Sequence, residues 1–219
     1  MSDDITLPPD QPLTPDDELA IDLDTLRHAA QEREWAALQV TLAKLLNMLP
    51  PFAALQAVIG GLIEALSVVE SAYPEDDPRR AIPRQLLTGI VSYGFAPDRL
   101  PEDLIGDYDA PGGAQYMHAV LEIARASQRD RSHEERQAFL VSAAANAIIA
   151  QMGAVFYGKN PDLFTRVRDN QVDVETGEYS DPDAAKIPIM LWMDEEVAAL
   201  DTAQWLALAD RVAQAYKSF

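Results

Sequence analysis

The 219-residue sequence predicts an all-α fold: a helical bundle of about six main helices around a buried central helix at residues 133–157. Three observations support this prediction. Apolar residues recur at steps of three and four residues over much of the chain, which is the helix period. Prolines and glycines fall between these segments. Finally, residues 139–150 are almost free of charge, which is typical of a helix buried on most sides.

Residues 1–18 differ from the rest of the chain. They contain four prolines and six acids and no base. Such a stretch buries little apolar surface and recovers little of the entropy lost on ordering. We therefore expect an acidic, Pro-rich, extended tail, acting as a solubilising end or as a docking arm. Residues 19–219 are expected to form a single all-α domain.

The first helical pattern is a hairpin. A helix begins near Asp24 and ends before the Pro-Pro pair at 50–51, because proline cannot supply the backbone donor of a helix interior. A second apolar stripe follows over residues 52–69, and the short turn makes the two helices antiparallel. The Gly-Gly pair at 60–61 indicates the close approach of a neighbouring helix or a kink.

The middle of the chain alternates between loops and helices. Proline and charge predict a loop at 73–83, followed by a short helix at 84–93. Residues 94–113 are rich in Gly and Pro and are expected to be irregular, with a short helical turn at 101–105. A further helix is predicted over 114–127.

The central helix has a clear start signal. Ser132 and Glu135 have the spacing of a capping box, and the apolar pattern after them continues to about Tyr157. A short helix at 160–168 comes next. Alternation around a Gly turn then predicts a minor β-hairpin near 171–180.

Two helical segments complete the chain. Pro188 opens a stretch that extends to Leu200. Asp201 is predicted to be the N-cap of the last helix, with Gln204 as its capping-box partner.

Charge and composition exclude several classes of function. The chain has 36 acids against 17 Lys and Arg, a net charge of −19, so it is unsuited to nucleic acid or to an anionic membrane surface. It lacks cysteine, which excludes thiolate metal sites and disulfides. No apolar run approaches the roughly 18 residues of a membrane helix, and the acidic N-terminus is unlike a secretory signal. We therefore expect a cytoplasmic protein that attracts basic partners.

Two His–Glu pairs are the only candidate metal site. His28 and Glu32 lie one helical turn apart, as do His118 and Glu122 on another helix. If the two helices faced each other, the pairs could bind one divalent metal through two nitrogens and two oxygens. The simpler interpretation is a surface hydrogen bond within each pair.

A cluster of arginines marks the turn before the central helix. Arg125, Arg129, Arg131 and Arg136 could bind a carboxylate or phosphate, on a small anion or on a partner. Acids lie among them, so local ion pairing is the competing interpretation.

The sequence contains no recognisable nucleophile, P-loop or HExxH motif. We therefore expect a non-enzymatic protein without a cofactor that binds another protein with a basic surface, as an adaptor, a chaperone-like partner or an inhibitor. Trp192 and Trp205 lie near predicted helix ends, where they form the edge of the core or anchor a partner. The alternative is an enzyme or small-ligand protein that uses the His and carboxylate metal site.

Overall fold

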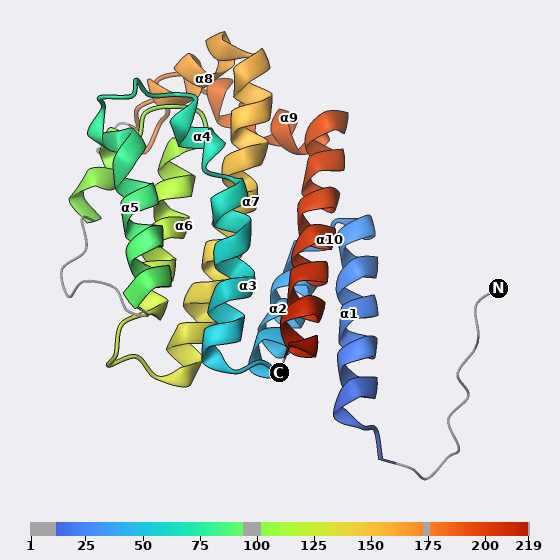
Figure 1. Cartoon of the computed structure of the whole chain (residues 1–219). Coiled ribbons are helices and arrows are strands. Elements are labelled where there is room, and N and C mark those ends of the chain that lie inside the picture. Colours follow the sequence, from blue (N-terminus) through green and yellow to red (C-terminus); the bar gives the residue numbers. More distant parts are fainter. Residues whose placement is uncertain (1–11, 94–101, 173–175, 219) are drawn as a thin grey trace.

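The computed structural model describes residues 12–93, 102–172 and 176–218 (Figure 1). Within these ranges the chain is helical and forms no strand, so the all-α prediction is confirmed. At the predicted hairpin, Val172 and Tyr179 form an isolated antiparallel bridge, and residues 173–175 lie outside the described ranges.

The helices are short to medium in length apart from two long ones. In chain order they are α1 (Pro15–Glu32), α2 (Trp35–Asn47), α3 (Pro51–Glu64), α4 (Ser67–Glu70), α5 (Pro78–Tyr93), η1 (Glu102–Asp107), α6 (Gly113–Ala126), α7 (His133–Lys159), α8 (Pro161–Arg168), η2 (Ala184–Lys186), α9 (Ile187–Met193) and α10 (Glu195–Lys217).

Helix α7 is the central helix of the bundle, as predicted. It packs against α2, α3, α6 and α10. Figure 1 shows α5 and α6 on one side of α3 and α7, with α2, α10 and α1 on the other. Ile148, in the uncharged middle of α7, is only 4% exposed. The predicted capping box starts the helix: the Ser132 hydroxyl accepts from the Glu135 amide, and the Glu135 carboxylate accepts from the Ser132 amide.

Helix α1 begins inside the segment for which the sequence predicted an extended tail. Its first residue is Pro15, and Thr14 is the N-cap. The Thr14 hydroxyl accepts from the Asp17 amide at 3.2 Å, and the Asp17 carboxylate accepts from the Thr14 amide at 3.0 Å. This capping box satisfies two otherwise unpaired donors, so the helix starts before the first buried residue, Leu19. Residues 1–11 lie outside the described part of the chain.

The prediction of one helix from Asp24 to Pro50 is wrong. Helix α1 ends at Glu32, and α2 begins at Trp35. Between them Arg33 adopts a left-handed backbone conformation with φ of 57°. Non-glycine residues rarely adopt this conformation, so the local sequence contains no signal for the break.

Two other predicted helix starts are also wrong. Helix α5 begins at Pro78 rather than at residue 84, with Pro83 buried inside it. Helix α10 begins at Glu195, because the Asp194 carboxylate caps it by accepting from the amides of Glu196 and Val197. Asp201, the predicted N-cap, therefore lies inside α10 and is buried.

Glycines allow two close approaches between elements. A Cβ on Gly61 would lie 2.9 Å from the Arg211 guanidinium of α10, which supports the predicted close approach of a neighbouring helix. Gly112 has φ of 77°, and a Cβ there would lie 2.1 Å from the Ala150 carbonyl oxygen of α7. Only glycine therefore fits at the start of α6.

Two stretches of the described chain have the length and hydropathy of membrane-spanning helices. They are Pro51–Glu70 and His133–Lys159, and their most apolar windows are 61% and 56% buried. Buried core helices commonly share these properties, so this is weak evidence for a membrane location.

Candidate functional site

Helix α9 carries the most conspicuous exposed apolar surface of the described chain. Its sequence, IPIMLWM, is apolar all round, but only Ile187 and Leu191 are buried. The remaining large side chains are exposed by 37–77% and define the α9 surface: Ile189, Met190, Trp192 and Met193. Contiguous exposed apolar residues of this kind mark interaction sites more often than isolated ones do.

An aromatic cluster packs between the α9 surface and the core of the bundle. The Trp35 ring, at the start of α2, packs edge-on against Trp192 with centroids 5.2 Å apart. Its other neighbour is Trp205 of α10, at 5.4 Å and also edge-on. Trp205 is fully buried, whereas Trp192 is 37% exposed. The three tryptophans therefore extend from the core to the surface.

A buried polar cluster ties the end of α9 to the bundle. The Arg33 Nε atom lies 3.2 Å from Asp201 Oδ2, and Arg33 Nη1 donates to the Trp192 carbonyl oxygen at 2.9 Å. Trp35 Nε1 also donates to Asp201 Oδ2, at 3.1 Å. We call these three side chains the Arg33–Asp201 clasp. The Asp201 side chain is 1% exposed and the Arg33 side chain 27%, so the clasp joins the α1–α2 break, α9 and α10 around one buried carboxylate.

Acidic residues flank the α9 surface. Residues 181–196 contain five acids and one base, a net charge of −4. Three of these acids are paired: Asp181 with Arg166 of α8 and Asp183 with Lys186, both at 2.9 Å, and Glu196 with Lys159 of α7. Glu195, which precedes Glu196, is exposed. The apolar surface is thus bordered by negative charge.

The structure does not bring together the predicted metal-binding pairs. His28 and Glu32 lie on α1 and His118 and Glu122 on α6, and these helices lie on opposite sides of the bundle (Figure 1). Both histidines and Glu32 are exposed, whereas Glu122 is buried beside Arg125, with its Oε1 2.5 Å from Arg125 Nη1. In the described ranges no group of three His, Asp or Glu side chains could hold a metal ion.

The four predicted arginines gather around the α6–α7 turn, where the guanidinium groups of three of them make the following contacts. Arg125 pairs with Glu122 and with Glu102, the latter at 3.0 Å. Arg131 donates to Gln128 from two nitrogens. The Arg136 guanidinium donates to four backbone carbonyl oxygens at the end of α6 and in the following turn, namely those of Ala126, Gln128, Arg129 and Arg131. Arg129 is exposed.

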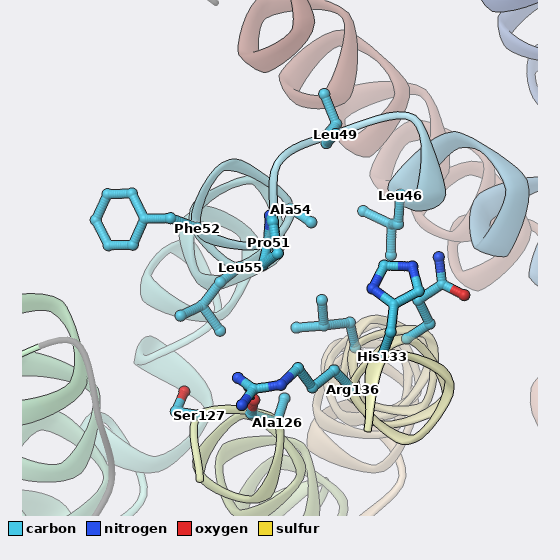
Figure 2. A pocket seen from close by; sticks show the side chains of 12 residues that line it. Leu46, Leu49, Pro51, Phe52, Ala54, Leu55, Ala126, Ser127, His133 and Arg136 are labelled. Atoms are coloured by element: carbon cyan, nitrogen blue, oxygen red, sulfur yellow. Dashed lines mark hydrogen bonds between the residues drawn. The ribbon is translucent and has the colours of Figure 1, made fainter. Parts of the chain in front are cut away.

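Beside this turn lies a cavity of about 210 Å³ (Figure 2). It opens where the end of α2, the start of α3, the end of α6 and the start of α7 meet. Its walls are mostly apolar, and the described lining includes no Asp or Glu. The lining residues are Leu46, Leu49, Pro51, Phe52, Ala54, Leu55, Ala126, Ser127, His133, Arg136, Gln137 and Leu140.

A second polar cluster lies at the start of α5. The Arg79 guanidinium lies 4.3 Å above the Tyr73 ring and binds the carboxylates of Asp77 and Asp109. The neighbouring Tyr108 is buried, which raises its pKa to about 12. The ion pairs of Arg79 hold α5 against the segment before α6, so we interpret the cluster as structural.

Sequence reasoning placed Trp192 among the possible partner anchors but missed the clasp, since Arg33 and Asp201 are 168 residues apart. One available signal for the α9 surface was the uninterrupted apolar segment 187–193, which is followed directly by three acids.

Comparisons with family models, with curated proteins and with solved structures find no match to this chain.

Proposed function

We propose that this protein binds another protein through the α9 surface, and that the partner presents a basic amphipathic segment. The observation that carries the proposal is the exposure of four large apolar side chains on one short helix that the clasp holds against the bundle, namely Ile189, Met190, Trp192 and Met193. A tryptophan at the edge of such a surface can anchor a partner, and methionines can adapt to its shape. The site requires neither a cofactor nor a reaction.

Charge supports the choice of a basic partner. The acids before and after α9 would lie beside Lys or Arg residues that flank the apolar face of a bound segment. The net charge of −19 would speed the encounter with such a partner and disfavour acidic competitors. An adaptor, a chaperone-like protein and an inhibitor of a basic protein would all use a surface of this kind.

Rigidity supports the choice of α9 as the contact. A seven-residue helix is too short to be stable alone, so its shape depends on its anchors. Here Trp35 and the Arg33–Asp201 clasp hold its carboxyl end. A surface held in one conformation loses less entropy on binding than a mobile one.

The test uses an amphipathic peptide built from Leu and Lys as the probe, with binding followed by fluorescence anisotropy of a label on the peptide. An acidic protein attracts any cationic peptide, so the apolar contact must be isolated by matched variants. Ile189→Ser removes apolar surface from α9, and Val40→Ser removes it from α2. Both side chains are 60% exposed in the wild type, and neither substitution changes the charge.

We expect Ile189→Ser to weaken binding by about fivefold or more. Val40→Ser should leave binding unchanged. A peptide of Leu and Glu should not bind wild-type protein. Equal effects of the two serine variants, or none from either, would show that binding is only electrostatic and does not involve the α9 surface.

A further inference from the structure

We infer that the cavity between the ends of α2, α3, α6 and α7 binds a small amphipathic carboxylate, such as a medium-chain fatty acid. This site is separate from the α9 surface, because the two lie at opposite ends of the bundle (Figure 1). The inference does not depend on the proposed protein partner.

One wall of the cavity suits an apolar chain. Leu46 and Leu49 come from α2 and its following turn, Leu55 from α3, and Leu140 from α7. Figure 2 shows Leu55 pointing toward the space beside the Arg136 guanidinium, whereas the Phe52 ring points away from it. The volume of about 210 Å³ is below the roughly 300–1,000 Å³ of drug-sized sites, so the ligand should be small.

The opposite wall carries positive charge. The Arg136 side chain crosses the cavity toward Ser127 (Figure 2). Its five N–H groups make four described hydrogen bonds, and all of these go to backbone carbonyls. In the described chain no carboxylate forms an ion pair with Arg136, so neutral dipoles alone offset its charge. A bound carboxylate would supply the missing counter-charge.

The surroundings of the cavity favour an anion over a neutral ligand. The described lining contains one arginine and one histidine and no acid, although the chain has a net charge of −19. Two helices begin at the cavity, α3 at Pro51 and α7 at His133, and two end there, α2 and α6. Helix starts carry partial positive charge and helix ends partial negative charge, so the preference for an anion rests on Arg136. No described side chain caps the start of α3.

Binding can be measured by calorimetry with three probes of one chain length: octanoate, octan-1-ol and octylammonium. We expect octanoate to bind at one site, about tenfold or more tightly than octan-1-ol. Octylammonium should bind most weakly, because its charge opposes that of Arg136. Absence of octanoate binding, or equal affinity for octanoate and octan-1-ol, would overturn the inference.

Variants locate the site. Leu55→Trp places a larger side chain in the cavity and should abolish octanoate binding. Arg136→Gln should reduce the affinity for octanoate to near that for octan-1-ol. Arg131→Gln is the matched control, since it removes a charge from the same turn outside the cavity lining, and it should leave the affinity nearly unchanged.

Circular dichroism checks that each variant folds. If Arg136→Gln does not fold because α6 loses its terminal hydrogen bonds, Leu55→Trp decides the question. Octanoate binding that is unaffected by Leu55→Trp would place the ligand elsewhere and refute the assignment.

Discussion

Replacing Asp201 by alanine tests the Arg33–Asp201 clasp. The substitution removes a carboxylate whose Oδ2 accepts from Arg33 at 3.2 Å and from Trp35 at 3.1 Å. Removing one partner of a buried ion pair costs about 3–5 kcal/mol, because the other charge is left without its counter-charge. The Arg33 side chain is 27% exposed and can be partly hydrated in the variant. We therefore expect the free energy of unfolding to fall by about 2–4 kcal/mol.

Two further variants separate charge from hydrogen bonding. Asp201→Asn keeps an oxygen that can accept from Trp35 but loses the ionic contact, so its cost should be smaller than that of Asp201→Ala. In a double-mutant cycle with Arg33→Ala, the combined loss should be clearly less than the sum of the single losses, because both substitutions break the same contact.

Urea unfolding followed by circular dichroism measures these free energies, and tryptophan emission reports on the Trp35 and Trp192 environments. The emission of Asp201→Ala should shift toward that of solvent-exposed indole before global unfolding, since the end of α9 loses its anchor. A loss below about 0.5 kcal/mol, or additive single losses, would refute the clasp as an energetic link between α9 and the bundle.

Three further perturbations test the fold. Gly112→Ala should lower the free energy of unfolding by about 3 kcal/mol or more, because the new side chain combines a left-handed backbone with a clash against α7. Gly89 lies inside α5 with open space around it, so Gly89→Ala should raise the free energy of unfolding by up to about 1 kcal/mol. Thermal unfolding measures both changes. Ile148→Ala should lower the free energy of unfolding in urea by about 2–5 kcal/mol, and a loss under about 0.5 kcal/mol would contradict the central position of α7. Hydrogen bonds within the capping boxes lower the pKa of Asp17 and of Glu135, so their stabilisation is present above the unfolded-state pKa and is lost as the pH falls through the folded-state value. Replacing both by their amides should make the acid-induced loss of stability less steep, and an unchanged pH profile would contradict this origin.

Several features of the fold could be predicted because their signals are local. The Ser132 and Glu135 spacing predicts the start of α7, and the uncharged segment after it predicts a buried helix. The Pro-Pro pair at 50–51 predicts the turn between α2 and α3. Each of these signals acts through backbone donors or through helix periodicity within a few residues, so no knowledge of the partner helices is needed.

The candidate sites could be predicted only in part. The sequence placed Arg136 in a possible anion site and Trp192 at a possible contact surface, and in the structure Arg136 lines a cavity and Trp192 is partly exposed. It also paired His28 with His118 in a hypothetical metal site, although their helices lie on opposite sides of the bundle. Periodicity shows which face a residue occupies on its own helix, but it does not show which helix that face meets.

The sequence by itself determined the helical class, the buried central helix and the negative charge of the chain. Tertiary structure alone decided the break at Arg33, the burial of Asp201 inside α10 and the exposure of α9. The physical reason is the distance along the chain between the interacting groups. Local hydrogen bonds from the Arg33 and Glu34 amides to the last carbonyls of α1 close the break, but the Arg33 side chain contacts a carboxylate 168 residues away. Only the folded bundle brings these two side chains together.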